Sequence, residues 1–376
     1  MRKGRIGIQA IALMAMMSVS VAKAAAQAPA ADQKKADAAS SDEQRPKTLP
    51  APTVKTTVQR WFDLQTASVL ARYRKVETST GVVSSNHVQD SVALKARIKF
   101  DAKAKYTLNA GLATGTTFTG GWNNVGWGTG GPRVTNLYLK QLFLAAAPVK
   151  GLDVSYGGLG FVRGESTEIT TYDNDGYLVG ARVSVKRPKR FHVDEISFTN
   201  GYVGDTTKPS FVNRYSRLDE VNYRHLLVGR RIGKALGLSA DYTRLSGVDT
   251  ARAAVNVKTP DAHVIDLVRY EQYKRFGATA AFGFAAYGEK AFTKRVALGA
   301  GYADIDAKYG GLNADRFNKG RRLFEQATLK VTRDLSLSGF LTQAVHNSFA
   351  VYNKKRGDLV LTYNALAPIQ RAGLFR

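Results

Sequence analysis

Hydrophobic and polar residues alternate with a period of two along most of the chain from Phe62 onward. The clearest stretch runs from Val88 to Asp101. One face of this stretch carries Val88, Val92, Leu94, Ala96, Ile98 and Phe100, together with Asp90, and the other carries Gln89, Ser91, Lys95, Arg97 and Lys99. Such alternation over ten or so residues predicts a strand with one face in lipid and the other in water. A soluble β-sandwich alternates too, although usually in shorter strands.

A weak internal repeat indicates tight hairpins. Several segments begin with a basic or turn residue and continue as alternating apolar residues that end on glycine or an aromatic: 105–111, 150–156, 234–242, 295–302 and 333–340. Longer polar, glycine-rich connections lie between the hairpins, at 77–87, 120–133, 164–175, 204–218, 247–275, 308–320 and 347–356. Short turns that alternate with long loops are typical of membrane barrels.

This pattern predicts an all-β fold, a transmembrane antiparallel up-and-down β-barrel of about fourteen strands. An even number of strands returns both chain ends to the periplasmic side. Twelve or sixteen strands also fit, because strand boundaries predicted from one sequence shift by a few residues. Residues 264–276 are the least certain stretch, since they could form a strand or part of a long loop.

The N-terminus predicts export. Residues 1–5 are basic, Ile6 to Ala22 is mainly apolar, and small residues follow at Ala22, Ala24 and Ala26, which is the pattern of a cleavable signal peptide over 1–26. The alternative is an uncleaved anchor, which the short segment and its cleavage sites disfavour. Residues 27–56 are rich in Ala, Pro, Lys, Asp and Ser and predict a disordered periplasmic leader. The barrel is expected over 57–366 in the outer membrane of a Gram-negative bacterium, with a periplasmic tail over 367–376.

Composition restricts the partners. The 376 residues carry a formal net charge of +25 and no cysteine, so disulfides and Cys-ligated metals are excluded. A strongly basic chain suggests nucleic acid, a lipid surface or acidic solutes as partners. The export signal argues against nucleic acid. Beyond that signal, no apolar run reaches the length of a membrane helix.

From about Phe62 to Leu366 the chain resembles the bacterial outer-membrane porins. The resemblance rests on this architecture and on the hairpin at 137–157, LYLKQLFLAAAPVKGLDVSYG. Porins often end on an aromatic residue that the barrel assembly machinery reads. Here Phe375 is penultimate and Pro368 interrupts the preceding strand, so the last strand is expected to end near Leu366. The resemblance implies outer-membrane lipid, lipopolysaccharide and the assembly machinery as partners, and it is compatible with a homo-oligomer.

The resemblance also draws attention to the third long loop, which in porins often folds into the lumen. By this count it spans Gly164–Asp175 and contains no Lys or Arg. Its acidic residues are Glu165, Glu168, Asp173 and Asp175. We expect the loop to form a constriction. The alternative is an acidic surface loop, which could bind a divalent cation.

Basic side chains are expected to line the pore opposite this loop. The candidates share mostly apolar neighbours at i±1: Lys95, Arg97, Lys99, Lys140, Arg182 and Arg224. A charge on lipid at mid-membrane costs roughly 2–4 kcal/mol, so inward placement is favoured unless a bulge shifts the register by one. Further basic residues at the short turns, around 186–190, 230–234 and 294–295, are expected to form a solvated periplasmic rim.

Aromatic residues are expected at the membrane interfaces or in loops. They are Trp122, Trp127, Tyr156, Tyr242 and Tyr302. A sharper reading of the two tryptophans is a stacking platform for a sugar, but a role in the aromatic girdle or in loop packing is favoured.

Passive diffusion of small hydrophilic, preferably anionic, solutes is the favoured function. About fourteen strands enclose more room than side chains can fill, since eight suffice for a filled barrel. The alternative is a structural or adhesive barrel without an open pore. An enzyme ranks third, because the five histidines form no close pair and no nucleophile or metal motif is present. No cofactor or metal is expected, and the leader is too short for the plug domain of an active transporter.

Overall fold

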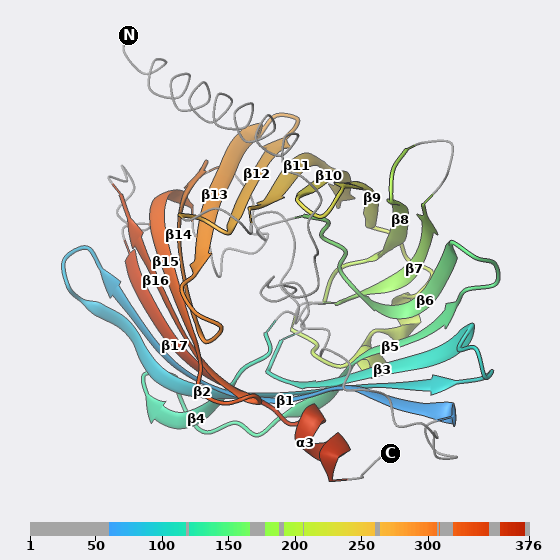
Figure 1. The fold of residues 1–376 in the computed structure, drawn as a ribbon, viewed down its shortest axis with the longest axis horizontal. Helices are drawn as coiled ribbons and strands as arrows, with labels where there is room; N and C mark the ends of the chain where they lie inside the picture. Colours follow the sequence, from blue (N-terminus) through green and yellow to red (C-terminus); the bar gives the residue numbers. More distant parts are fainter. Residues whose placement is uncertain are drawn as a thin grey trace. The chain divides into compact units, whose positions relative to one another are not determined.

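Sixteen antiparallel strands form a closed ring in the computed structural model (Figure 1). The ring strands are β1 (Phe62–Thr78), β2 (Val83–Lys99), β3 (Tyr106–Thr114), β5 (Leu137–Ala146), β6 (Leu152–Gly160), β7 (Tyr177–Lys186), β8 (Glu195–Tyr202), β9 (Tyr223–Ile232), β10 (Leu236–Leu245), β11 (Val248–Lys258), β12 (Leu267–Arg275), β13 (Ala281–Ala291), β14 (Val296–Ile305), β15 (Gly320–Lys330), β16 (Leu335–Ala344) and β17 (Lys354–Asn364). The structure describes residues 60–376 except 118–119, 166–176, 188–191, 206, 260–263, 307, 309–318, 346–353 and 373–376. The predicted signal peptide and leader lie outside the described residues.

The ring closes because the first strand pairs with the last. β1 and β17 are in antiparallel register from Ser68↔Asn364 to Thr78↔Lys354, while the other edge of β1 pairs with β2. Each remaining ring strand pairs with the next one along the chain. No ring strand is left with an open edge, which is the condition for a sheet whose backbone polar groups lie in lipid.

A seventeenth strand lies beside the ring strands without joining the closure. β4 (Asn123–Gly128) pairs only with β2, at His87, Gln89 and Asp90. β3 pairs with β2 only from Ala93 to Lys99, so the earlier residues of β2 are available to β4. β4 therefore extends the wall beyond the end of β3.

Sixteen strands lie within the range that the sequence predicted, at its upper limit. The predicted loop at 247–275 instead contains the whole of β11 and β12. Its charged residues Arg252, Arg269 and Glu271 gave the segment a loop-like polarity, yet all three are buried side chains on one face of these strands. The turn before β11 has only two residues, Ser246 and Gly247, with φ of 49° and 82°. This left-handed pair matches the tight hairpin turn that follows the twist of the strands.

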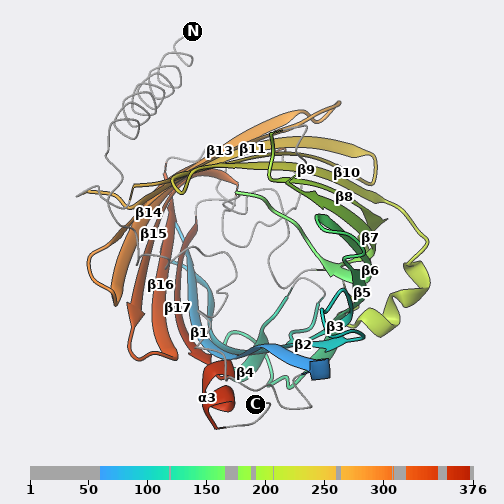
Figure 2. The same ribbon diagram turned by 45° about the vertical axis from the view of Figure 1, so that its right-hand side comes forward.

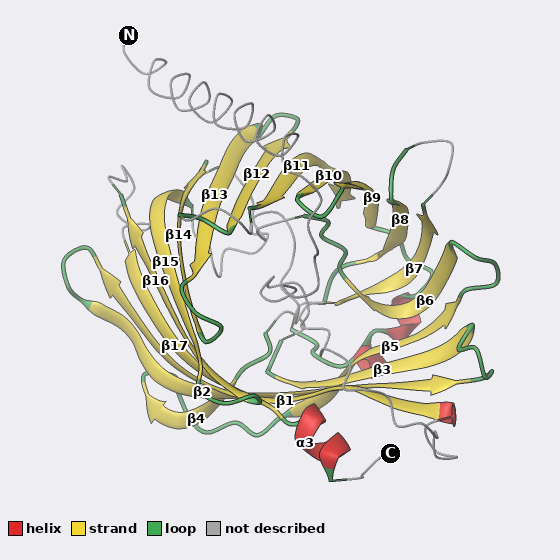
Figure 3. Ribbon diagram, in the orientation of Figure 1, coloured by secondary structure: helices red, strands yellow, loops and turns green. Residues whose placement is uncertain are grey.

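Hydrophobicity is inverted relative to a soluble protein. Large apolar side chains are exposed on the outward face, including Val69, Ile98, Leu144, Phe198, Phe282, Leu323 and Leu359, whereas buried positions include Arg72, Lys99, Arg252, Glu271 and Arg322 (Figure 3 shows the strands that carry them). Strand parity separates the two sets, because successive side chains point to opposite faces. The outer surface is thus an apolar belt and the inner surface is polar.

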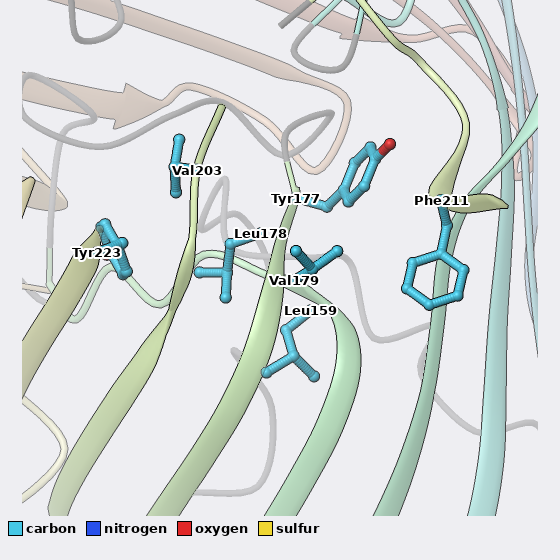
Figure 4. Close-up of a cluster of buried hydrophobic side chains, with 7 residues drawn as sticks. All are labelled: Leu159, Tyr177, Leu178, Val179, Val203, Phe211 and Tyr223. Atoms are coloured by element: carbon cyan, nitrogen blue, oxygen red, sulfur yellow. The ribbon is translucent and has the colours of Figure 1, made fainter. Parts of the chain in front are cut away.

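One sector of the wall is packed on both sides. Between β8 and β9, two short 3-10 helices, η1 (Phe211–Asn213) and η2 (Tyr215–Arg217), lie outside the ring (Figure 2). Phe211 packs against Gly158, where an added Cβ would lie 2.6 Å from the Phe211 ring. On the inner side, Phe161 meets Tyr223 edge-on with ring centroids 5.6 Å apart. Figure 4 shows the buried cluster at this sector: Leu159, Tyr177, Leu178, Val179, Val203, Phe211 and Tyr223.

The chain after β17 turns into a short helix. α3 (Leu366–Arg371) buries Leu366, and the backbone N–H of Ala365 donates to the Ala67 carbonyl of β1 at 2.8 Å. Among the described residues no helix has both the length and the apolarity to cross a membrane. The chain divides into two units, 1–47 and 48–376, and every described residue belongs to the second.

The inverted packing predicts that a lysine destabilises the barrel far more on the outward face than on the inward face. Leu359 points outward at the closing seam, between Gly339 and Tyr73, whereas Ser338 points inward. Leu359→Lys should lower the free energy of unfolding by about 2–4 kcal/mol in lipid vesicles, because the ammonium would enter hydrocarbon. Ser338→Lys should change it by less than about 1 kcal/mol, because the lumen offers a polar surface. Urea unfolding followed by tryptophan fluorescence measures both, and equal losses would contradict the assignment of the faces.

Candidate functional site

The predicted basic face of β2 points inward, near the end of the barrel where β1 begins and β17 ends. Lys99 Nζ lies 2.6 Å from Asp63 Oδ1, and Arg97 donates to the other oxygen of the same carboxylate at 2.6 Å. Lys95 lies on the same face, opposite Gly111. One aspartate therefore offsets part of the charge of these three residues.

Lys140 and Arg182 are also inside the wall, but their donors are directed at fixed acceptors. Lys140 occupies a β-bulge, and its Nζ donates to the carbonyls of Thr117 at 3.1 Å and Gly120 at 2.5 Å. Arg182 donates to Thr199 Oγ1 at 3.1 Å and to the Gly160 carbonyl. Both side chains hold chain segments in place, so their charged groups are directed at the wall and not into the lumen.

Arg224 lies on the outward face, contrary to its predicted place in the pore lining. It lies opposite Asn200 and Arg244 and shares the outward face of β9 with Leu226, which is 43% exposed. The inward residues of β9 are instead Tyr223 and His225, both buried. Near the rim the inner face is apolar because Phe161 packs on Tyr223. The apolar neighbour of Arg224 therefore faces the interior, and it did not indicate a lipid-facing position.

A group of arginines that the sequence reading missed lies on the inner face of β1 and β17. Arg74 donates to both oxygens of Asp358, at 2.8 and 3.0 Å, and Arg356 Nε donates to the same carboxylate at 2.9 Å. Arg72 lies two residues before Arg74 on the same face and donates to Gln89 at 3.1 Å. The buried Arg322 of β15 continues this surface and donates to the Lys354 carbonyl. Alternation with Val69, Ala71 and Tyr73 is the signal that could have identified Arg72 and Arg74. We call Arg72, Arg74, Arg322, Arg356 and Asp358 the arginine wall.

The two tryptophans lie on opposite faces. The guanidinium of Arg72 lies 3.9 Å from the centre of the Trp122 ring, on the inner side. Trp127 is 52% exposed and meets Tyr73 edge-on on the outer side, with ring centroids 6.1 Å apart. Tyr156 and Tyr242 are exposed on the outward face. Tyr302 also points outward, because it lies opposite Ala286 and the exposed Leu323.

The opposite wall carries a compact ionic cluster. β10 lies half of the sixteen-strand ring away from β1 in either direction (Figure 1). Arg252 Nε donates to Asp241 at 2.6 Å, and its Nη1 donates to Glu271 at 3.4 Å. The buried His225 lies 3.7 Å from the other oxygen of Asp241. Acidic and basic groups are more evenly matched here than on the arginine wall.

The beginning of the third long loop lies against this cluster, inside the barrel. Arg252 Nη2 donates to the Arg163 carbonyl at 2.7 Å, and the Glu165 backbone N–H donates to Ser239 Oγ at 2.8 Å. The Glu165 carboxylate accepts from Asn256 at 3.1 Å and lies 3.3 Å from Arg231 Nε. Glu168, Asp173 and Asp175 lie outside the described residues. In the described ranges no group of three or more acidic or histidine residues could hold a metal ion.

Solved structures with the same fold are porins. The chain superposes on OmpF of Salmonella typhi, recorded in complex with daunomycin, with a TM-score of 0.53 at 10% identity, covering 82% of this chain and 99% of the other. A mutant of the Rhodopseudomonas blastica porin gives a TM-score of 0.51 at 14% identity, over 81% and 99%. No family model and no curated protein sequence matches the chain.

The closed ring, the apolar outer belt and these superpositions define the class. The chain is a transmembrane β-barrel with a porin-like fold, as its sequence pattern indicated.

The ionic cluster should contribute to stability as a unit. Arg252→Gln removes the guanidinium between two buried carboxylates, so it should cost about 3–5 kcal/mol, the usual result of breaking one side of a buried ion pair. Adding Asp241→Asn should restore part of this loss, because the buried charge goes with its partner. Unfolding by guanidinium chloride in detergent measures both variants. A double variant no more stable than Arg252→Gln would contradict coupling between the two residues.

Proposed function

We propose that this barrel is a channel for passive diffusion of small hydrophilic solutes. The observation that carries the proposal is the charged inner wall of a sixteen-strand ring, with the arginine wall on one side and the Arg252 cluster on the other. A ring of this size encloses more space than wall side chains fill, since eight strands already give a filled interior. Charged side chains on the inside are compatible with a water-filled lumen.

Anions are the solutes that the inner surface favours. The arginine wall has four guanidinium groups and one carboxylate, and it faces a wall where acidic and basic residues are mixed. Fixed positive charge on one side of a narrow aqueous path raises the local concentration of anions. The start of the third loop already lies inside, so we propose that Glu165, Glu168, Asp173 and Asp175 form the opposing side of a constriction with a transverse field.

A structural or adhesive barrel is the competing proposal, and a homo-oligomer is compatible with either. Single-channel recordings in planar bilayers separate the two functions. Discrete ohmic steps support the channel, and a refolded protein that inserts without conducting would support the structural barrel.

Ion selectivity should depend on the arginine wall. Arg72→Gln with Arg356→Gln leaves the Arg74–Asp358 pair in place and removes two positive charges. A unit charge about 10 Å from the ion path in water contributes about 0.4 kcal/mol, so chloride preference should fall about twofold per charge. Reversal potentials under a salt gradient measure this. As a matched control, Arg97→Gln with Lys99→Gln removes the same charge near the barrel end and should act more weakly, because salt screens it there.

The third loop gives a separate test of the constriction. Changing Glu165, Glu168, Asp173 and Asp175 to amides should strengthen anion preference, because the negative side of the transverse field is lost. Shortening the loop within residues 166–176 should raise single-channel conductance. If the amides leave reversal potentials unchanged and the shorter loop leaves conductance unchanged, the loop does not form the constriction.

A further inference from the structure

A cluster of cations lies on the outer face of the barrel, at the edge of the apolar belt. Arg224 of β9 and Arg244 of β10 are directly opposite each other, and Lys274 of β12 lies in the next row, opposite Ala251. All three are exposed. The single carboxylate among them is Asp249, which lies opposite Arg244 with Oδ1 3.8 Å from Nε. We call Arg224, Arg244, Asp249 and Lys274 the outer cationic patch.

The patch has more positive charge than its own carboxylate can offset. Its formal charge is three cations against one anion. The Tyr242 hydroxyl donates a hydrogen bond to the same Asp249 oxygen at 2.6 Å, so Arg244 shares this oxygen with Tyr242. Like charges directly opposite on neighbouring strands destabilise a sheet. An anion placed between Arg224 and Arg244 would remove this repulsion.

The surroundings of the patch indicate where that anion comes from. Directly below the two arginines lie Leu226 and Tyr242, 43% and 42% exposed, and they belong to the apolar belt. Directly above, the β10–β11 turn has only Ser246 and Gly247, so its own hairpin provides no loop to cover the patch. The patch lies at the end of the barrel with the longer loops, which faces the outside of the cell in barrels of this class. A ligand here has an apolar part against the belt and an anionic part level with the arginines.

We propose that the outer cationic patch binds the phosphate groups of an outer-leaflet glycolipid. Guanidinium groups present paired N–H donors that match phosphate oxygens, and they do so better than a point charge. The acyl chains of the same lipid would lie on Leu226, Tyr242 and the exposed Phe282 below. A free solute anion lacks this apolar part, so the apolar belt would contribute nothing to its binding.

The test compares lipid binding by matched variants of the full-length protein, refolded in detergent. Arg224→Gln with Arg244→Gln removes two charges from the patch. Arg230→Gln with Arg295→Gln removes two charges at the opposite end of the barrel and serves as the control. Each protein is titrated with bisphosphorylated lipid A and with its dephosphorylated form, and bound lipid is counted by native mass spectrometry. Heat-modifiable migration on gels confirms that each variant has refolded.

Lipid A should bind the Arg224/Arg244 variant at least about tenfold more weakly than the wild type, with the control within about twofold. Dephosphorylated lipid should bind the wild type as weakly as lipid A binds the variant. Arg224→Gln alone should lose less, because Arg244 and Asp249 remain. Equal affinity of wild type and double variant for lipid A would overturn the proposal. Displacement of lipid A by inorganic phosphate at comparable concentration would overturn the assignment to a lipid and indicate a site for a solute anion.

Discussion

Closure of the sheet at the β1–β17 seam is the constraint on which the rest of the structure depends. Lipid supplies no hydrogen-bond partner, so every strand edge in the wall has to find one within the protein. The register from Ser68↔Asn364 to Thr78↔Lys354 supplies it across residues nearly 300 positions apart in the chain. Once the ring is closed, strand parity sends every second side chain to lipid. Charged residues within the hydrocarbon zone then have only the interior left.

The interior charges are held by fixed partners rather than left free in water. Asp358 binds two guanidinium groups, Arg252 joins two carboxylates, and Lys140 is fixed by two carbonyls. Such contacts hold each charge at a fixed position on the wall, which supports the proposed anion preference. The same Arg252 cluster binds the start of the third loop through the Arg163 carbonyl. Stability of the wall and position of the loop are thus coupled.

Alternation assigned the face correctly on β2 but not at the rim of β9. Lys95, Arg97 and Lys99 lie on the face that alternation assigned to them, since their outward neighbours include the exposed Ile98. Arg224 lies on the other face, because at the rim the inner wall packs against Phe161 while the outer wall has left the hydrocarbon zone. In the segment that became β11, the small residues Ala251 and Ala253 flank the charged lumen residue Arg252, so its composition resembled a loop.

The sequence by itself determined the class of fold: period-two alternation between short turns and longer loops is a local property that needs no knowledge of neighbours. It also indicated which face of β2 is polar. Only the tertiary structure decided the strand number, the pairing of β4 with β2 and the assembly of the arginine wall from β1, β15 and β17. These depend on register between distant strands. A period of two fixes the two faces of one strand relative to each other, but closure and packing decide which face becomes the inside.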